Sequence, residues 1–329
     1  MENSQDYVEK GQYLVEKRVD NAPVMLVCNP IAGSRRGTAY LSQVRRALDA
    51  EGIAYSSEMS QHQGHAVHLA RAAVETGCRA VVAIGGDGTF HEVVNGVMQA
   101  ADANTNAERR VAVGLVQAGR GSDFGRSAGL PADIDSAISR LLVGRTQDID
   151  LGHVKYLGFD GEEQSRYFAN SAGLGFDAEV TQRANSAPRA LGGTIPYLSS
   201  LLMTLGTFRN KRVTFKSGDG PVWHGRINSM VVANGQYFGG GMKIAPDAEI
   251  ADGQFDVIIL GDLGKVDLVV NVPRVYDGSH LTHPKVRSFR SSYLEASSQD
   301  RLLLQADGEV LGMAPASFSV KPAALRLIV

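Results

Sequence analysis

Hydrophobic residues over residues 24–145 alternate between short β-branched runs and longer stretches with helical spacing. The runs predict buried strands, and the stretches predict helices, because helices repeat apolar residues every three or four positions. In chain order the predicted elements are strand Val24–Val27, helix Gly37–Ala50, strand Ile53–Met59, helix Gly64–Thr76, strand Ala80–Ile84, helix Phe90–Ala100, strand Val111–Val116 and helix Ile134–Val143. This alternation predicts right-handed βαβ units and a mostly parallel, doubly wound α/β domain.

The pattern changes after about residue 148, where polar and apolar residues alternate. Strand-like runs there are Arg212–Lys216, Val222–Ala233, Phe255–Leu260, Val286–Phe289 and Leu302–Gln305. The Gly218–Pro221 turn predicts a hairpin between the first two runs, and one helix is expected over Tyr197–Thr207, with Thr194 as its cap. We therefore expect a first domain over 22–147, a β-rich, sandwich-like second domain over 148–316, and a C-terminal segment, 317–329, that returns to the first domain.

Composition narrows the class of protein. The 329 residues correspond to about two domains, and 33 Lys and Arg against 35 Asp and Glu give a net charge of -2, so the overall charge indicates no nucleic-acid partner. Two cysteines, Cys28 and Cys78, are too few for a disulfide framework. The first twenty residues lack a secretory apolar block, and no later apolar stretch is long enough to span a bilayer. We expect a cytoplasmic protein.

The clearest chemical signal is the segment Ala83–Glu92, AIGGDGTFHE, which leads from a buried strand into a helix. Glycines let backbone N–H groups surround phosphate oxygens, and the helix N-terminus adds partial positive charge. A carboxylate in such a cradle repels phosphate unless a divalent cation lies between them, so Asp87 implies Mg²⁺. Two more glycine-bearing loops, Asn29–Gly33 and Gly119–Asp123, follow strands of the same sheet. Together the loops favour a nucleotide polyphosphate.

Several short motifs occur in a defined order. They are Asn29–Gly33, Gly85–Gly96, Asp123–Arg126, Asp150–Gly152, Asp252–Gly253, His283–Val286 and Asp307–Glu309. In order and spacing they resemble the diacylglycerol and sphingosine kinase-like lipid kinases from about Val24 to the C-terminus. The resemblance implies an ATP-binding domain like that of phosphofructokinase and NAD kinases, followed by an antiparallel β-sandwich-like domain, with ATP and the lipid meeting in the cleft between them.

The resemblance also implies residue roles. ATP would be held by Asn29, Pro30, Ile31, Ala32, Gly33, Ser60, Gly86, Asp87, Gly88, Thr89, Phe90, His91 and Glu92. Glu309 would accept the proton of the lipid hydroxyl, with Asp87 as the competing candidate. Asp87, Asp123 and Asp150 would organise catalytic Mg²⁺ and its waters.

Two further expectations concern a structural metal ion and one position where this chain differs from the family pattern. The resemblance implies a structural Mg²⁺ bound by the Asp252 side chain and the backbone carbonyls of Glu249 and Gln254, which are hard oxygen ligands. The family usually has Gly-Thr-x-Asn-Asp-Phe where this chain has Gly119-Arg120-Gly121-Ser122-Asp123-Phe124, so Arg120 replaces a threonine. We expect Arg120 to contact a nucleotide phosphate, because its guanidinium matches phosphate geometry; a solvent-facing Arg120 is the alternative.

The acceptor is left open by the sequence. We expect diacylglycerol, giving phosphatidate, with sphingoid bases and phosphatidylglycerol as alternatives. A different class, NAD kinase, shares the Gly-Gly-Asp-Gly signature, and a non-catalytic binding protein is a third class. The motifs Asn29-Pro30, His283–Lys285 and Asp307–Glu309 favour the lipid kinase. A lipid substrate implies peripheral contact with the membrane surface; a homodimer stays open.

Two weaker patterns complete the analysis. The stripe of apolar residues in Ile195–Phe208 is followed by basic residues, among them Arg209 and Arg212. Such a stripe is typical of a core helix, and a helix lying on anionic lipid is the alternative. His62, His65 and His68 are spaced like metal ligands, although polar residues at the start of a helix are a far commoner explanation.

Overall fold

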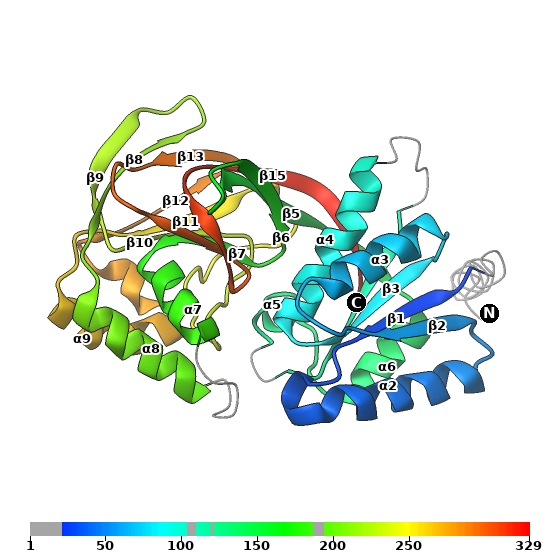
Figure 1. Cartoon of the computed structure of the whole chain (residues 1–329). Helices are drawn as coiled ribbons and strands as arrows, with labels where there is room; N and C mark the ends of the chain where they lie inside the picture. The colour runs from blue at the N-terminus through cyan, green and yellow to red at the C-terminus, as the bar shows by residue number, and fades with distance from the viewer. Residues whose placement is uncertain (1–21, 104–109, 120–121, 187–193) are drawn as a thin grey trace, which may run out of the picture.

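The computed structural model describes residues 22–103, 110–119, 122–186 and 194–329. The chain forms two lobes (Figure 1), one with a parallel sheet between helices and one dominated by antiparallel strands. This is the α/β domain followed by a β-sandwich-like domain that the sequence predicted, so the predicted fold class is confirmed.

The first lobe is built on four parallel strands. They are β1 (Val24–Cys28), β2 (Tyr55–Met59), β3 (Ala80–Gly85) and β4 (Ala112–Gln117), in the order β2-β1-β3-β4. The helices are α2 (Ala32–Ala50), α3 (His65–Glu75), α4 (Asp87–Ala103), α5 (Asp123–Ser127) and α6 (Ile134–Val143). Leu26 belongs to the core under α2 and α6, whereas Val27 belongs to the core under α3 and α4. Successive strand residues therefore face opposite helix layers, which buries both faces of the sheet.

The second lobe is a sandwich of two antiparallel layers. Its strands are β5 (Thr146–Leu157), β6 (Glu163–Phe168), β7 (Ser171–Gly175), β8 (Lys211–Ser217), β9 (Val222–Ile227), β10 (Ser229–Ala233), β11 (Phe255–Leu260), β12 (Val286–Ser291), β13 (Tyr293–Ser297), β14 (Leu303–Ala306) and β15 (Glu309–Ile328). One layer runs β12-β11-β10-β7-β14 and the other contains β6-β5-β15-β13-β8-β9. Phe168, Phe255 and Phe318 are fully buried between them.

Helices cover the outer face of the first of these layers. They are α7 (Phe176–Ser186), α8 (Thr194–Thr207), α9 (Lys265–Asp277) and a short 3₁₀ helix (Ser279–Thr282). Val231 and Ile258 point outward from β10 and β11 and pack against the segment around Ile244 and against Val275 of α9. Among the residues that the structure describes, no helix combines the length and the apolarity needed to cross a bilayer.

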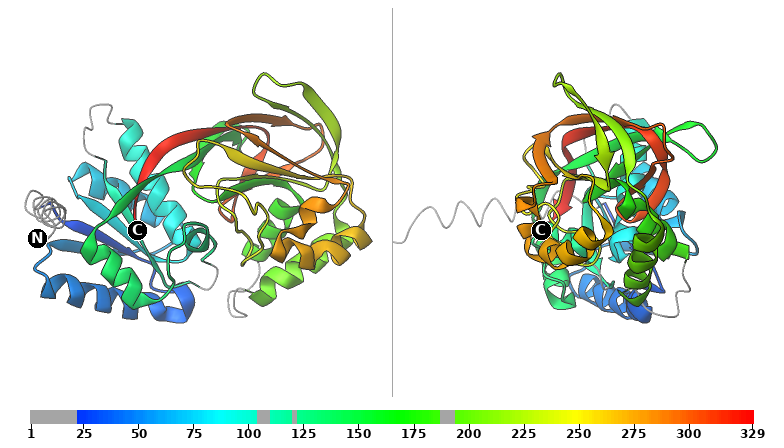
Figure 2. Two further views of the ribbon diagram at one scale, coloured as in Figure 1. Left: turned by 180° about the vertical axis from the view of Figure 1, so that it is seen from behind. Right: turned by 90° about the vertical axis from the view of Figure 1, so that its left-hand side faces the viewer.

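Two long strands join the lobes, as the view from behind shows (Figure 2). β15 pairs with β13 and β14 in the sandwich, and its last residues, Arg326 and Leu327, pair in parallel with Ala112 and Val113 of β4. β5 follows β15 in antiparallel register along most of this path. The sheets of both lobes are therefore hydrogen-bonded into one continuous surface.

Some predicted boundaries were wrong, for identifiable reasons. The Gly-Asp-Gly-Thr segment was expected as a loop before a helix at Phe90, but α4 begins at Asp87. The predicted strand Val222–Ala233 is interrupted at Asn228, whose N–H donates to the carbonyls of Leu260 and Gly261. Consequently β9 pairs with β8 in one layer while β10 pairs with β7 and β11 in the other.

Close contact between α3 and α4 generates a prediction. A Cβ atom on Gly96 would lie 2.2 Å from the Val67 carbonyl oxygen, so Gly96→Ala should force the helices apart and lower the free energy of unfolding by about 1–3 kcal/mol. The control is Gly206→Ala in α8, where no atom lies within 4 Å; helix propensity should leave that variant equal or about 1 kcal/mol more stable. Urea unfolding of both variants tests this, and an undiminished stability of Gly96→Ala would contradict it.

Candidate functional site

The loops after β1, β3 and β4 meet at one edge of the parallel sheet. Asn29 links the first two, because its Nδ2 donates to Thr89 Oγ1 at 3.3 Å while its Oδ1 accepts from the N–H of Ile31 at 3.2 Å. Gly33 has φ +56°, and a Cβ there would lie 1.7 Å from the Ala118 carbonyl oxygen. Only glycine fits this approach, which brings the first loop against the third.

The third loop also approaches the second. A Cβ on Gly119 would lie 2.9 Å from the Cα of Gly86, so these backbones are almost in contact. Ser60, at the end of β2, is held near the first loop by its N–H, which donates to the Cys28 carbonyl at 2.8 Å. Pro30 lies on the first loop, Ala32 is the first residue of α2, and Gly88 lies in the first turn of α4. Arg120, expected to replace a threonine contact, lies outside the described residues.

Three of the predicted nucleotide contacts have side chains engaged inside the protein. Phe90 stacks on Phe124, with ring centroids 4.3 Å apart. His91 is 1% exposed, and Glu92 accepts hydrogen bonds from the N–H groups of Gly64 and Ala66, where it caps α3. Any contact of this turn with a nucleotide therefore has to come from its backbone and from Asp87–Thr89 at the N-terminus of α4, where the helix dipole favours anions.

Asp87 is the carboxylate at that helix terminus. Its Oδ2 accepts from the Asp123 N–H at 3.1 Å and its Oδ1 accepts from the Phe124 N–H at 3.3 Å. Burial, together with the neighbouring carboxylates of Asp123 and Asp307, raises the pKa of Asp87 from 3.8 to about 6. Neighbouring carboxylates disfavour one another's ionised forms, so a cation bound between them would stabilise the ionised form of Asp87.

Asp123 is the second carboxylate of this group. Its oxygens accept from the N–H groups of Gly240 and Gly241 at 2.7 and 2.8 Å and from Arg126 Nη1 at 3.0 Å. Burial raises its pKa. Mg²⁺ in proteins is held by one or two carboxylates together with waters and substrate phosphates, and the Asp87–Asp123 pair fits that donor set.

Asp150 occupies a different environment from the other two acids. Its Oδ2 accepts from the Gly253 N–H at 2.6 Å, and its Oδ1 accepts from the Ala323 N–H at 2.7 Å. No hydrogen bond between described residues joins its carboxylate to Asp87 or Asp123. The structure thus brings Asp87 and Asp123 together and places Asp150 where it fastens β15 to the loop before β11.

Glu309 comes from the second lobe and reaches the first. The carboxylate of Asp307 accepts from His91 Nδ1 at 3.0 Å and from the N–H groups of Ala169, Asn170 and Ser171 at 2.8–3.0 Å. This turn carries Glu309 to 3.8 Å from His91 Nε2, and Glu309 Oε1 accepts from Gln63 Nε2 at 3.4 Å. The Glu309 side chain stays 19% exposed, so it remains accessible to a ligand.

The Asp252 carboxylate, predicted to hold a structural Mg²⁺, already has partners within the protein. Asp252 forms an ion pair with Arg290, and its Oδ1 accepts from the Gln254 N–H at 3.0 Å. Asp256 Oδ2 is buried without a hydrogen bond, 3.9 Å from Arg290 Nε, and burial, Asp247 and Glu249 raise the pKa of Asp256. The oxygens suit Mg²⁺, but Arg290 already supplies the positive charge, so this second metal site stays a prediction.

No group of three or more His, Cys, Asp or Glu side chains that could hold a metal is formed by the described residues. This includes His62, His65 and His68: the rings of His62 and His65 stack on each other, with centroids 5.2 Å apart. His65 and His68 lie in the first turn of α3, and His62 precedes the helix.

The sequence analysis missed an apolar cavity of about 90 Å³ in the second lobe. Its walls include Leu201, Met242, Leu268 and Val272, from α8, α9 and the segment after β10. One carboxyl, Asp177 of α7, lies in this wall, and burial raises its pKa.

The Asp177 side chain in the cavity wall is connected to the turn that carries Asp307 and Glu309. Asp177 Oδ2 accepts from Gln305 Nε2 at 3.1 Å, and Gln305 Oε1 accepts from the Gly308 N–H at 3.0 Å. The same Gly308 stands between Asp307 and Glu309. Gln305 was part of a predicted strand, and no local pattern marked it or Asp177 as functional.

Comparisons with known proteins agree with this geometry. A family model described as the diacylglycerol kinase catalytic domain matches residues 23–154, and the YegS C-terminal NAD kinase beta sandwich-like domain matches residues 170–329. Proteins named diacylglycerol kinase from Staphylococcus carnosus and Bacillus subtilis are each 28% identical to this chain over 89% of its length, covering 90% and 91% of those proteins.

Solved structures share the fold. A diacylglycerol kinase from Bacillus anthracis aligns with a TM-score of 0.69 at 18% identity, covering 93% of this chain and 96% of that one. An NAD kinase from Archaeoglobus fulgidus, solved in complex with ATP, aligns with a TM-score of 0.52 at 11% identity, covering 93% of each chain. At these identities the likeness shows the fold alone.

The raised pKa of Asp87 generates a prediction about stability. Between pH 3.8 and about 6 the folded state holds a proton that the unfolded state has released, so the stability that protonation contributes is present below pH 3.8 and is lost as the pH rises through 6. Asp87→Asn removes this loss. The stability of the variant relative to the parent should therefore rise by about 2 kcal/mol between pH 4 and 7 without Mg²⁺ or nucleotide. Urea unfolding measures it, and parallel pH profiles would contradict it.

Both halves of the site lie inside the matched ranges. The catalytic-domain model contains Asp87, Asp123 and Asp150, and the second model contains Asp307, Glu309 and the cavity walls. Together the two models match nearly the whole described chain in the order that the motifs predicted. The chain therefore belongs to the diacylglycerol kinase-like family of lipid kinases.

Proposed function

We propose that this protein transfers the γ-phosphoryl group of ATP to the hydroxyl of a lipid, with diacylglycerol as the acceptor and phosphatidate as the product. The observation that carries the proposal is the position of Glu309, a carboxylate of the second lobe that reaches His91 and Gln63 of the nucleotide-binding lobe. An acceptor bound by one lobe would thereby meet a nucleotide bound by the other.

The nucleotide would lie on the loops after β1, β3 and β4. Backbone N–H groups at the start of α4 and the close approach of Gly33, Gly86 and Gly119 suit the phosphates. Asp87 and Asp123 would hold Mg²⁺, which when bound neutralises charge on the phosphate oxygens in the loose transition state. The Asn29 side chain fixes the first loop against Thr89, which keeps the cradle formed before the nucleotide arrives.

Phosphoryl transfer then needs one proton acceptor. The lipid hydroxyl oxygen forms a bond to the γ-phosphorus, the bond from that phosphorus to the bridging oxygen breaks, and ADP leaves. The proton of the hydroxyl passes to Glu309, whose carboxylate is accessible and is positioned by the Asp307 turn. Asp87 stays the competing base, because it lies at the phosphate-binding helix terminus with a pKa near 6.

The lipid tail would use the cavity under α8 and α9. Its walls are mostly apolar, and the Asp177–Gln305–Gly308 chain of hydrogen bonds connects Asp177 in the wall to the Glu309 turn. A cavity of about 90 Å³ is smaller than the roughly 300 Å³ at which ordinary ligand pockets begin, so a full acyl chain requires α8 and α9 to separate.

Labelled ATP tests the proposed activity directly. With Mg²⁺ and mixed micelles of diacylglycerol, sphingosine or phosphatidylglycerol, label should enter diacylglycerol. Glu309→Gln should lower kcat by about 10²- to 10⁴-fold, because a general base is lost, while the KM for ATP stays within about threefold. Glu163→Gln, on an exposed strand, is the matched control and should retain full activity.

Other outcomes of that assay are decisive. Label entering NAD, supplied as a separate acceptor, would replace the proposal with an NAD kinase. Full activity of Glu309→Gln together with loss in Asp87→Asn would make Asp87 the base. No transfer to any acceptor would contradict the proposed activity.

Asp150 gives a separate prediction, because the sequence assigns it to Mg²⁺ and its observed partners are backbone amides. Asp150→Asn leaves one amide donor facing an NH₂ group, so the free energy of unfolding should fall by about 1–3 kcal/mol. The Mg²⁺ concentration for half-maximal activity should stay within about twofold of the parent at a temperature where the variant is folded. A Mg²⁺ requirement raised tenfold or more would instead support a role in holding the ion.

A further inference from the structure

Helix α9 is apolar on two opposite faces. Leu268, Val272 and Val275 face the cavity and the sheet. On the other side Val266, Val269 and Val270 are 76%, 55% and 65% exposed. Single exposed valines are ordinary on a protein surface. A continuous apolar stripe on the outer side of a helix is typical of a surface that contacts a membrane or another molecule.

Helix α8 extends this surface. Leu202 and Met203 are 57% and 66% exposed, whereas Leu205 on the opposite side is buried. Lys265 Nζ, at the start of α9, donates to the Gly206 carbonyl of α8 at 2.5 Å, so the two helices are joined at this end. Both helices lie along the same edge of the second lobe in Figures 1 and 2. We call the exposed residues Leu202, Met203, Val266, Val269 and Val270 the apolar face.

Basic residues gather at the joined end of the helices. Arg209, Arg226 and Lys265 line one hollow there, and Lys211 and Arg212 begin β8, where Arg212 pairs with Arg226. The acids beside them are Asp262, 3.8 Å from Arg226 Nε; Asp300, which accepts from the backbone N–H of Arg212; and Asp267 of α9, which pairs with Lys285. The cations therefore outnumber the acids beside the apolar face.

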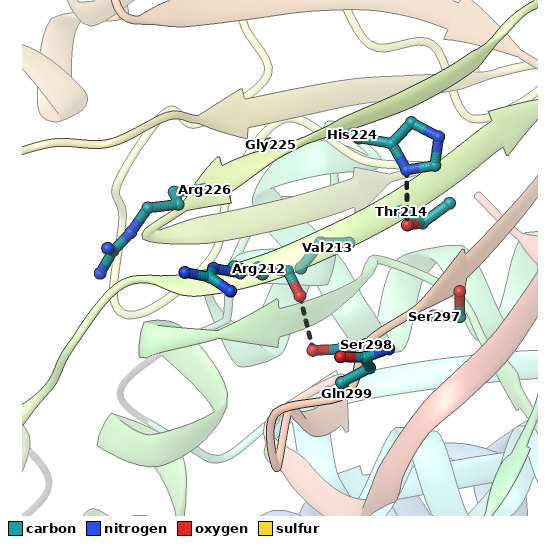
Figure 3. A pocket seen from close by; sticks show the side chains of 9 residues that line it. All are labelled: Arg212, Val213, Thr214, His224, Gly225, Arg226, Ser297, Ser298 and Gln299. Atoms are coloured by element: carbon teal, nitrogen blue, oxygen red, sulfur yellow. Dashed lines mark hydrogen bonds between the residues drawn. The ribbon is translucent and has the colours of Figure 1, made fainter.

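Two of these cations are forced together by the sheet. Arg212 and Arg226 are directly opposite each other on β8 and β9, an arrangement that costs stability unless an anion lies between them. They line an open hollow of about 680 Å³ with His224, Ser297 and Gln299. Figure 3 shows both arginine side chains at one end of this hollow and His224 held by Thr214 farther along the strands.

We propose that the apolar face and this arginine pair dock the protein on a phospholipid bilayer that contains anionic lipid. Valine, leucine and methionine side chains enter the boundary between headgroups and acyl chains, while Arg212 and Arg226 bind lipid phosphates. The cavity proposed for the lipid tail lies directly beneath the same two helices, so docking brings its ligand to it. The inference deepens the proposed lipid kinase function and rests on it.

Vesicle flotation tests the docking surface. The parent protein should float with vesicles of phosphatidylcholine and phosphatidylglycerol and much less with phosphatidylcholine alone. Arg212→Gln/Arg226→Gln should lower partitioning onto the anionic vesicles by about 30-fold, since each basic residue near such a surface contributes about fivefold. Val266→Ser/Val270→Ser should lower it at least tenfold. The controls are Val143→Ser and Arg46→Glu on exposed helix positions of the first lobe, which should bind like the parent.

An activity arm separates docking from catalysis. Both double variants should phosphorylate short-chain diacylglycerol, dissolved as monomers, within about twofold of the parent, and should lose activity on long-chain diacylglycerol in vesicles in parallel with binding. A parent that phosphorylates the short-chain lipid but does not float overturns the docking proposal and leaves the kinase intact. A parent that floats but phosphorylates nothing contradicts the kinase and leaves docking intact. Unchanged flotation of the variants, or a parent dimer that Val266→Ser/Val270→Ser dissociates, would also overturn docking.

Discussion

The carboxylate of Asp307 joins the two lobes, and the geometry of the site follows from it. Three consecutive backbone N–H groups, those of residues 169–171, donate to it from the second lobe, and His91 donates from α4 of the first. Hydrogen bonds to an ionised acceptor are roughly twice as strong as neutral ones. Asn95 adds a second link, because its amide both donates to and accepts from the backbone of Tyr167. The turn held by Asp307 places Glu309 at the first lobe, where Glu309 contacts Gln63 and His91.

In the protein without a bound cation, the surroundings of the cleft disfavour the ionised form of Asp87. Asp87, Asp123 and Asp307 are buried near one another, and the same three carboxyls are surrounded by backbone N–H groups. The N–H groups favour the charged forms and burial disfavours them; at Asp87 burial dominates and its pKa rises to about 6. Such a site gains most from a divalent cation and least from a neutral ligand, which suits phosphoryl transfer.

The helix layer of the second lobe has apolar residues on its outer side as well as on the side that faces the sheet. Helices that cover a sheet normally present one apolar stripe to it and polar residues to water. Here α9 presents valines on both sides, and the packed residues between the helices and the sheet leave an apolar cavity of about 90 Å³. A lipid substrate in the cavity and a lipid bilayer against the outer valines account for these two features.

The alternating βαβ pattern, the antiparallel second lobe and the glycine-bearing loops at the strand ends were predictable from the sequence, because they depend on local periodicity and turn chemistry. The sequence also marked Asp87, Asp123 and Glu309 through motif order. The partners of these residues were decided only by the tertiary structure: His91 and Asp307 are 216 positions apart, and Asp177 and Gln305 are 128 apart. The sequence analysis predicted no helix over α9, and apolar residues on a helix do not reveal which side the rest of the chain will cover.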